Sequence, residues 1–418
     1  MSVSNHRKQL LDTIADDSIV ICYSGQLVHT NEDDYYYPFE VNSQFFWLTG
    51  IERANMVLLL TKTGGKTSET LFIEEADPSQ ERWTGRMLTP EEAADISGIE
   101  NVSFVDDFSD TIDFVITRNY IRQVYFDVFR QSQTDAPDFN LIKAKEFADM
   151  FPAITLCDLH AVVCPLRRVK DAEEIADVRA AIDVTRQGLE RVMSTLKPGM
   201  MEYQVQAEFE YACRSLGTKK YAFPTIAGSG YNGCMLHYET NEDEVPADGL
   251  ILLDLGAKYN NYCSDITRTY PVNGTYSPRQ RQYYELVLKA NREVAKAARP
   301  GITLRDLQEL CRRILGEGLV EMGKIDSVDE VSQYYMHGVS HSIGIDAHDV
   351  NIGQAVLEPG WIISDEPGLY IDEEEIGIRI EDDLLITEDG CEVLSENIIR
   401  DPDGEYPKVC VNLQTDVR

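Results

Sequence analysis

Five side chains in the second half of the chain are of types that bind divalent metal ions: Asp254, Asp265, His341, Glu366 and Glu381. Four of them are carboxylates, and their spacing predicts that they meet in pairs. Asp254 and Asp265 each lie beside an apolar run rich in residues that favour strands. A hairpin that turns at residues 259–260 would place these two carboxylates directly opposite each other, roughly 4.5–5.5 Å apart at Cβ.

A second hairpin would pair the other two carboxylates in the same way. A turn at residues 373–374 would place Glu366 opposite Glu381. Like charges at such positions destabilise a sheet, so two such pairs indicate that cations lie between them. Four carboxylates and one imidazole suit two divalent ions about 3.5–4 Å apart.

The hairpins also allow other interpretations. The chain has 72 acidic residues in 418, so opposed carboxylates can equally form a solvated acidic edge. In the second hairpin, Asp365 and Asp382 oppose each other on the other face of the strands. The alternation of side chains does not decide which face holds metal. The presence of both hairpins, with a histidine cluster between them, favours a metal site.

Histidines are concentrated in the same half of the chain. Four of the seven fall there: His237, His337, His341 and His348. A lone histidine is more often a structural residue than a ligand. Three of these lie within twelve residues, which is difficult to explain by packing alone.

Composition and charge exclude several classes of protein. Hydrophobic residues make up 43% of the chain and charged residues 26%, as in an ordinary water-soluble globular protein. The net charge of −34 argues against nucleic acid as a partner, because phosphate binding requires basic surfaces. No apolar stretch approaches the roughly 20 residues of a membrane helix, and the first residues lack a secretory signal. Since the nine cysteines include no C-x-x-C pair, we expect a cytoplasmic protein with reduced thiols and no membrane partner.

The pattern of elements predicts two domains, residues 1–160 and residues 161–418. The first alternates short β-like runs with amphipathic helical stretches, which indicates a smaller α/β domain. The second contains a duplication of architecture, in which a helix, a Pro-Gly pair and a second helix precede a histidine and an acidic hairpin. His237 precedes Asp254 by 17 residues, and His348 precedes Glu366 by 18. Two such halves facing each other would join both hairpins at a pseudo-twofold axis.

Seven short motifs connect these observations: Leu-His237-Tyr, Leu253-Asp254-Leu-Gly, Ser264-Asp265-Ile-Thr-Arg-Thr-Tyr-Pro, His337-Gly-Val-Ser-His341, Asp346-Ala-His348-Asp-Val, Glu366-Pro-Gly-Leu-Tyr370 and Gly377-Ile-Arg379-Ile-Glu381-Asp. With them the chain resembles the metallopeptidases of the pita-bread fold, specifically the proline-specific branch of aminopeptidase P and prolidase. The segments around Trp47 and Trp83 are similar to the N-terminal domain of aminopeptidase P. The resemblance implies an α+β protein. A smaller N-terminal α/β domain of the creatinase/aminopeptidase P type would precede a pita-bread domain with pseudo-twofold repeated halves.

The resemblance also implies how the five ligands divide between two metal ions. Asp254 would hold one ion, His341 and Glu366 the other, while Asp265 and Glu381 would bridge both. Ligands that are mostly oxygen atoms favour Mn²⁺, with Co²⁺ or Zn²⁺ able to replace it. A hydroxide bridging the two ions would attack the peptide carbonyl, with Glu366 as the proton shuttle.

Further residues would bind the substrate, a peptide with proline as its second residue. His237 and His348 would contact the substrate and the tetrahedral intermediate, and both are predicted to be catalytic. Tyr370 and Arg379 would lie behind the ligands or contact substrate. The alternatives are that Tyr370 only packs in the hairpin and that Arg379 only neutralises neighbouring acids. His337, Tyr370 and Trp83 are candidate walls of a proline pocket, whereas Trp47 and Trp361 are expected in the core.

These expectations predict an Xaa-Pro aminopeptidase, and the N-terminal segments favour it over a prolidase restricted to dipeptides. Creatine-hydrolysing relatives and ligand-free binding modules of the same fold lack the metal ligands, all five of which are present here. Ser342 follows the ligand His341 where relatives often have an aromatic residue, so we expect a pocket wall there that is larger or softer. Because relatives are usually dimers or tetramers, we expect a homodimer or a homotetramer.

Overall fold

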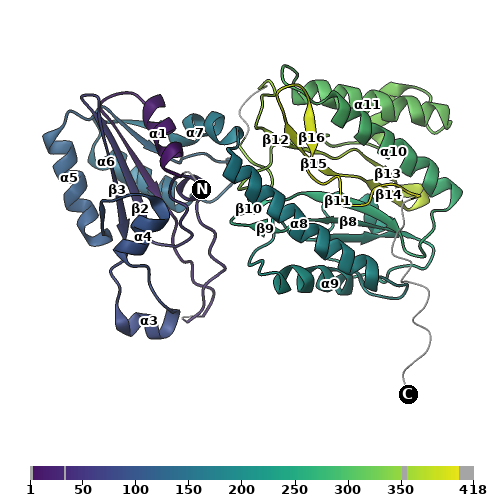
Figure 1. Cartoon of the computed structure of the whole chain (residues 1–418), viewed down its shortest axis with the longest axis horizontal. Helices are drawn as coiled ribbons and strands as arrows, with labels where there is room; N and C mark the ends of the chain where they lie inside the picture. The colour runs from purple at the N-terminus through teal and green to yellow at the C-terminus, as the bar shows by residue number, and fades with distance from the viewer. Residues whose placement is uncertain (1–2, 33, 351–354, 404–418) are drawn as a thin grey trace. The chain divides into compact units, whose positions relative to one another are not determined.

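The computed structural model describes residues 3–32, 34–350 and 355–403. The chain divides into two compact units, Met1–Arg167 and Arg168–Arg418 (Figure 1). Both units combine helices with strands, and the smaller α/β unit comes first, as predicted from the sequence. Among the helices of the described residues, none is both long and apolar enough to span a lipid bilayer.

The first unit contains one six-stranded mixed sheet in the order β4-β3-β2-β1-β5-β6. Its strands are β1 (Ser18–Tyr23), β2 (Val57–Thr63), β3 (Lys66–Ile73), β4 (Val102–Phe104), β5 (Gln123–Phe126) and β6 (Thr155–Asp158). Its helices are α1 (Val3–Thr13), α2 (Ser43–Thr49), α3 (Pro78–Thr84), α4 (Pro90–Ser97), α5 (Phe108–Arg118), α6 (Phe139–Met150) and α7 (Leu159–Arg168). Strands β1, β2 and β3 form an antiparallel meander, and the outer strands β4, β5 and β6 pair in parallel.

The second unit repeats one order of elements, a pair of helices followed by antiparallel strands. Its first half comprises α8 (Ala172–Thr195), α9 (Glu202–Ser215), β7 (Ile226–Ser229), β8 (Leu250–Leu255), β9 (Lys258–Tyr259), β10 (Tyr262–Cys263) and β11 (Ile266–Pro271). Its second half comprises α10 (Pro278–Ala297), α11 (Leu304–Glu321), β12 (Ile362–Asp365), β13 (Gly368–Ile371), β14 (Ile376–Arg379), β15 (Asp382–Ile386) and β16 (Cys391–Val393). Among the described residues the paired strands form four small sheets, β11-β8-β7, β10-β9, β12-β15-β16 and β13-β14.

Local sequence signals explain where the helices of this unit begin. The N-cap residues Asp171, Ser277 and Thr303 each accept a hydrogen bond from the backbone N–H three residues later, and each closes a capping box. These residues satisfy N–H groups that the first turn of a helix leaves free, so the sequence predicts the start of α8, α10 and α11 correctly.

The first acidic hairpin does not have the predicted register. Asp254 pairs with Thr267 rather than with Asp265. The turn lies at Asn260 and Asn261, both of which have positive φ (45° and 63°), as a two-residue hairpin turn of type I′ requires. This turn lies one residue later than predicted, so the partner of Asp254 moves by two positions. Because side chains alternate with period two, Asp265 still faces the same side of the sheet as Asp254.

The second acidic hairpin has the predicted register. Its pairs include Asp365 with Asp382 and Gly368 with Arg379. The regular ladder is interrupted between these pairs, where Glu366 and Glu381 lie. The two carboxylates therefore sit at corresponding positions of the hairpin but outside its hydrogen-bonded strands.

The two hairpins meet along β11 and the end of β14. The backbone N–H of Glu381 donates to the carbonyl of Thr267 at 3.0 Å. Two residues further along, the hydroxyl of Thr269 lies 3.1 Å from the carbonyl of Arg379 and accepts from its N–H at 3.2 Å. These contacts bring together carboxylates that are more than a hundred residues apart in the sequence, as the duplicated architecture predicts.

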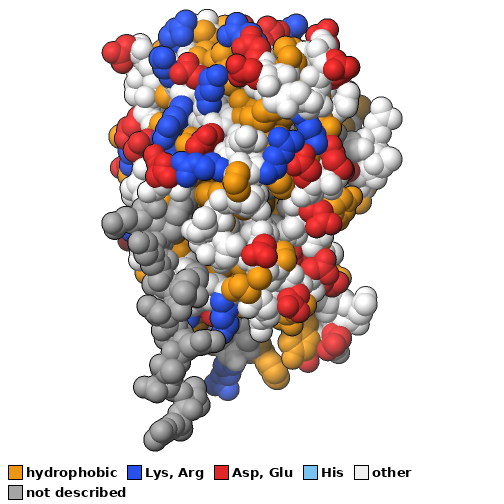
Figure 2. All heavy atoms as spheres, turned by 90° about the vertical axis from the view of Figure 1, so that its right-hand side faces the viewer, with side chains coloured by type: hydrophobic (Ala, Val, Ile, Leu, Met, Phe, Trp, Pro, Cys, Tyr) orange, Lys and Arg blue, Asp and Glu red, His pale blue; other side chains and the backbone are white. Residues whose placement is uncertain are grey.

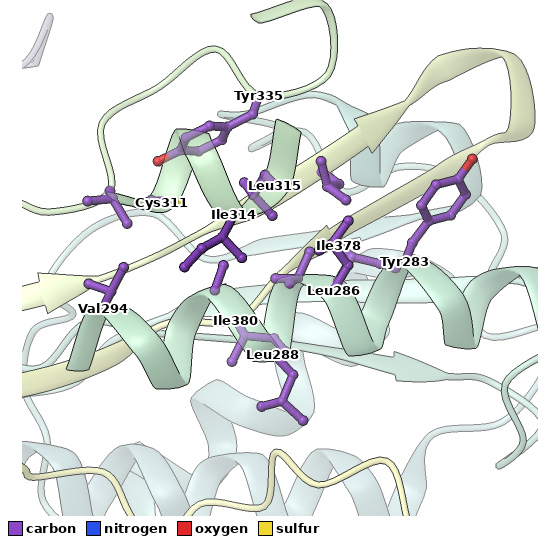
Figure 3. Packing of buried hydrophobic residues seen from close by; sticks show 14 of the residues in the cluster. Tyr283, Leu286, Leu288, Val294, Cys311, Ile314, Leu315, Tyr335, Ile378 and Ile380 are labelled. Carbon is purple, nitrogen blue, oxygen red and sulfur yellow. The ribbon is translucent and has the colours of Figure 1, made fainter. Parts of the chain in front are cut away.

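A hydrophobic core holds the second half of this unit behind its hairpins. Helices α10 and α11 contribute residues such as Leu286, Val294 and Leu315, which pack against Ile378 and Ile380 (Figure 3). Trp361 belongs to the same cluster and is fully buried. Trp47 is buried in the first unit, so the prediction that both tryptophans are core residues is confirmed.

Charged side chains of both signs cover the second unit. On the face shown in Figure 2, basic and acidic side chains lie interspersed rather than in separate fields. Exposed residues of this unit form ion pairs, such as Arg305 with Glu309 and Arg281 with Glu285. Exposed pairs of this kind contribute little to stability, at most about 1 kcal/mol each.

Candidate active site

The meeting of the hairpins creates a cavity of about 440 Å³ in the second unit. Nine of the ten predicted site residues line it: His237, Asp254, Asp265, His337, His341, His348, Glu366, Arg379 and Glu381. The tenth, Tyr370, is buried beside the cavity, where its hydroxyl contacts two of the lining residues. Side chains from both halves of the duplicated architecture thus reach one volume.

Three of the predicted ligands form the tightest group. One ligand atom each from Asp265, His341 and Glu381 lie within 4.8 Å of one another. His341 Nε2 lies 3.5 Å from Asp265 Oδ2 and 3.4 Å from Glu366 Oε1. His341 is fixed through its backbone N–H, which donates to Ser364 Oγ at 2.9 Å. An imidazole nitrogen facing two carboxylates at this separation is a donor set that suits a divalent cation.

The fourth carboxylate, Asp254, shows a gap in its hydrogen bonding. Its Oδ2 accepts from Arg379 Nη2 at 2.5 Å. Its Oδ1 is buried and has no hydrogen-bond partner among the described residues. A buried carboxylate oxygen without a donor is costly, and a bound cation would satisfy it. The residues present therefore fit the metal ions that the sequence predicts.

The pKa values of the carboxyl groups in the cavity also favour bound cations. Burial, together with neighbouring carboxylates, raises the pKa of both Asp265 and Glu381 well above the usual carboxyl range. Burial also raises the pKa of Glu366 to about 8, although Arg379 opposes the shift. Carboxylates crowded in this way are unfavourable as anions unless positive charge lies among them.

The histidines of the cavity are shifted in the opposite direction. Burial, with a contribution from His348, lowers the pKa of His341 to about 4. Burial and the nearby Arg379 likewise lower the pKa of His337 to about 4. Both imidazoles are therefore neutral near pH 7, and a neutral imidazole is the form that can bind a metal ion.

The opposite face of the second hairpin has its own positive charges. Asp382 accepts hydrogen bonds from Arg268 Nη2 at 2.7 Å and from Arg400 Nη1. Asp365 Oδ2 accepts from Asn291 Nδ2 at 3.2 Å. Arginine thus compensates Asp382 within the protein, while burial and the neighbouring Asp382 raise the pKa of Asp365. Glu366 and Glu381, on the other face, line the cavity. This arrangement distinguishes the two faces that the sequence left equivalent.

A chain of polar contacts runs from the ligands to His337. Arg379 donates to Asp254 Oδ2 through Nη2 and to the hydroxyl of Tyr370 through Nη1 at 2.8 Å. The same hydroxyl lies 2.8 Å from His337 Nε2. Arg379 therefore does more than neutralise acids, since it fixes both Asp254 and Tyr370. Tyr370 is only 1% exposed, so it supports His337 from behind rather than forming a cavity wall.

The other predicted residues occupy different surroundings. The ring of His348 stacks on that of His341, with centroids 4.0 Å apart. Ser342 is buried, and its hydroxyl accepts from Trp361 Nε1 at 2.9 Å. The expectation that Ser342 enlarges the pocket wall is therefore wrong, because its side chain is engaged in the core. Trp83 lies on α3 of the first unit, where it is 88% exposed.

Sequence reasoning missed the apolar side of the cavity. It includes Phe223, Pro224, Ile226 and Leu236. The first two precede β7 in an irregular segment without a periodic pattern, so no local signal placed them. The only indication was their position shortly before the Leu-His237-Tyr motif.

Comparisons with known proteins identify the family of this chain. Residues 176–388 match the model of metallopeptidase family M24, and residues 3–125 match that of the aminopeptidase P N-terminal domain. The chain belongs to family M24. It is a metallo-aminopeptidase with the predicted domain types, and its family implies that it binds divalent metal.

Individual relatives extend over nearly the whole chain. A protein named Xaa-Pro aminopeptidase from Escherichia coli (strain K12) is 32% identical over 420 residues, covering 95% of both chains. A solved structure of a putative aminopeptidase P from Bacillus anthracis superposes with a TM-score of 0.93 at 41% identity, covering 96% of each chain. A zinc-substituted E. coli aminopeptidase P in complex with product has a TM-score of 0.86 at 32% identity, with the same coverage. The predicted pita-bread architecture is thereby confirmed.

Proposed function

We propose that this protein is an Xaa-Pro aminopeptidase, which removes the N-terminal residue from peptides whose second residue is proline. The observation that carries the proposal is the convergence of His341 and four carboxylates on one cavity, with Asp254 Oδ1 buried and unpartnered among the described residues. The names of the relatives in E. coli and B. anthracis support the substrate class.

The ligand set would hold two divalent ions, of which Mn²⁺ is our first choice. Asp254 would bind one ion, His341 and Glu366 the other, and Asp265 and Glu381 both. When bound, two such ions lower the pKa of a water molecule enough to supply hydroxide near neutral pH, and they polarise a peptide carbonyl. The raised pKa values of Asp265, Glu366 and Glu381 support this assignment, because added positive charge would stabilise all three as anions.

Glu366 is the residue that we propose to move the proton. Bound cations would hold Glu366 as a carboxylate, and a carboxylate in this position can accept a proton and release it again. Its two oxygens lie 3.4 Å from His341 Nε2 and 3.6 Å from His337 Nδ1, so it faces the interior of the cavity. It would take the proton of the attacking water and deliver it to the leaving nitrogen of proline.

Three histidines would orient the substrate. His348, stacked on His341, and His237 on the facing segment both line the cavity, where each can donate a hydrogen bond to a peptide carbonyl or to the tetrahedral oxyanion. His337 is held by Tyr370 and would contact the substrate beside Glu366. These roles require side chains that do not bind metal themselves.

Selection of proline would depend on shape. A peptide bond to proline has no N–H, so a site for it needs no acceptor there. The apolar residues Phe223, Pro224 and Leu236 offer a surface on which a pyrrolidine ring could pack. Such a surface would favour proline over residues that project a flexible side chain.

The second candidate is a prolidase, which cleaves only Xaa-Pro dipeptides. Hydrolysis of a dipeptide Xaa-Pro and a tripeptide Xaa-Pro-Xaa, measured after chelation and after addition of Mn²⁺, separates the two. An aminopeptidase releases the first residue of the tripeptide. Turnover of the dipeptide alone would establish the prolidase instead. A tripeptide with alanine in second position serves as the control for proline selection.

A further inference from the structure

A buried carboxylate outside the cavity is attached to the segment that carries His237. Glu202, the first residue of α9, is fully buried. A buried carboxylate is unfavourable unless its oxygens accept hydrogen bonds, so its partners identify what it holds in place. All the donors described below come from residues 229–243, which we call the His237 loop.

Both oxygens of Glu202 bind this loop. Oε1 accepts from the backbone N–H and from the hydroxyl of Ser229, each at 2.7 Å, and from Asn232 Nδ2 at 3.2 Å. Oε2 accepts from the hydroxyl of Tyr238 at 2.8 Å and from the backbone N–H of Asp243 at 3.0 Å. The backbone N–H of Glu202 donates in turn to the carbonyl of Asp243 at 2.9 Å. One carboxylate thus fixes the beginning, the middle and the end of the loop.

The loop also contacts the strand that carries Arg379. A Cβ atom added to Gly377 of β14 would lie 1.9 Å from the carbonyl oxygen of Gly233, so the two backbones are in direct contact. Tyr238 and Leu236 pack against a buried apolar cluster that includes Tyr370. The loop is therefore held between Glu202 on one side and the second acidic hairpin on the other.

His237 depends on this support because its own side chain is exposed in the cavity. His237 follows a short 3-10 helix, Gly230–Cys234, and lies in a stretch without helix or strand, so its exposed ring is placed by the backbone. The residue that follows it, Tyr238, is the one whose hydroxyl binds Glu202. Loss of that anchor would release the backbone at His237 while leaving all five predicted metal ligands in place.

We propose that Glu202 is a positioning residue for His237, acting through Tyr238 and the two ends of the His237 loop. The inference rests on the proposed function, in which His237 contacts the substrate. Displacement of such a group by even 1 Å can cost up to about 100-fold in rate. Glu202 itself touches neither the cavity nor the predicted ligands.

The test is a mutant cycle between Glu202→Gln and His237→Ala, with Xaa-Pro-Xaa hydrolysis, Mn²⁺ content and thermal stability measured for each protein. In Glu202→Gln an NH₂ group replaces one carboxylate oxygen. It cannot accept the hydrogen bonds that this oxygen accepts, and it faces N–H and O–H donors of the His237 loop. We expect Glu202→Gln to lower kcat/KM by about 10- to 100-fold with Mn²⁺ content unchanged. In the His237→Ala background the same substitution should have less than a twofold effect, because its target is absent.

Two further variants complete the experiment. Glu242→Gln changes the same charge on an exposed residue of the same loop and should leave kcat/KM unaltered. Tyr238→Phe removes a single hydroxyl and tests the same coupling if Glu202→Gln fails to fold; its several-fold loss should also vanish with His237→Ala. Equal effects of these changes with and without His237 would overturn the inference. Absence of peptidase activity in the wild type would instead reject the proposed function.

Discussion

Arg379 donates a hydrogen bond to one oxygen of Asp254, at 2.5 Å, while the other oxygen of that carboxylate is buried without a partner among the described residues. The arginine thus fixes the orientation of Asp254 and leaves its other oxygen available to bind a cation. The same guanidinium reaches Tyr370, and Tyr370 reaches His337. A predicted ligand and a predicted substrate-binding residue are in this way held by one rigid group.

Removal of a bridging carboxylate should abolish metal binding and activity together. Asp265→Asn retains the shape of the side chain, but its amide cannot supply the charge that two cations need. We expect Mn²⁺ content below half of the wild-type value and a loss of kcat of at least about 100-fold. Metal analysis of the dialysed protein and peptide hydrolysis measure the two effects. Asp389→Asn, an equivalent change on an exposed loop, is the control, and an active Asp265→Asn protein would remove Asp265 from the ligand set.

His348→Ala should separate metal binding from catalysis. Its ring stacks on that of His341 but belongs to none of the metal-binding groups among the described residues. We expect Mn²⁺ content close to that of the wild type, with kcat lowered about 10²- to 10³-fold, as for the loss of a donor to an oxyanion. Steady-state kinetics and metal analysis of the same sample provide the comparison. Full activity would exclude His348 from catalysis.

The metal-free protein should lose stability as pH rises from about 6.5 to 8. Asp265, Glu366 and Glu381 have raised pKa values, so the folded state retains protons that the unfolded chain has released. The contribution of these groups to the free energy of unfolding is fully present below the ordinary carboxyl pKa. It is lost as pH rises through their pKa in the folded state, which is about 8 for Glu366. His337 and His341 have lowered pKa values and act oppositely, but only below about pH 6.5.

Thermal unfolding of the chelated protein at several pH values tests this prediction. The control is the same series with excess Mn²⁺, where bound cations replace the protons and the loss should be smaller. Buried cysteines affect the melting temperature equally in both series. The difference in melting temperature between the chelated and the Mn²⁺-loaded protein therefore reports on the carboxylates of the cavity. A melting temperature of the chelated protein that rises with pH in this window would show that the carboxylates are not destabilised as anions.

The ion pair behind the cavity should contribute strongly to stability. Arg268 and Asp382 pair at 2.7 Å, and both side chains are fully buried. Arg268→Ala leaves a buried carboxylate with one arginine fewer, which we expect to cost about 3–5 kcal/mol in urea unfolding. Arg305→Ala breaks an exposed pair with Glu309 and should change stability by less than about 1 kcal/mol. Similar values for the two variants would contradict the role assigned to Arg268.

Features that depend on a few neighbouring residues, such as helix starts and hairpin turns, were largely predictable from the sequence. Ser277 begins α10 because its side chain caps the helix, and the register of Glu366 with Glu381 follows from strands of known length around one turn. The pair of Asp254 and Asp265 was misregistered because Asn260 and Asn261 both adopt the left-handed conformation, which places the turn one residue later. That preference of consecutive asparagines could have been used at the start.

Tertiary structure decided what local rules could not. Arg268 and Arg400 reach Asp382 from separate segments, and this contact, together with the lining of the cavity, distinguishes the two faces of the hairpin. Phe223 joins the cavity wall from an irregular segment for which no periodicity exists. Glu202 lies at the start of a helix like many surface acids, and its role depends on a loop that folds back over it.

The central claim is that His341 and four carboxylates hold a pair of divalent ions on which peptide hydrolysis depends. Titration of the metal-depleted protein with Mn²⁺, following release of the first residue from an Xaa-Pro-Xaa tripeptide, tests it most directly. We expect no turnover after depletion and a return of activity that saturates at two ions per chain. Undiminished hydrolysis by the metal-depleted protein, or full activity with no Mn²⁺ bound to the chain, would contradict the assignment.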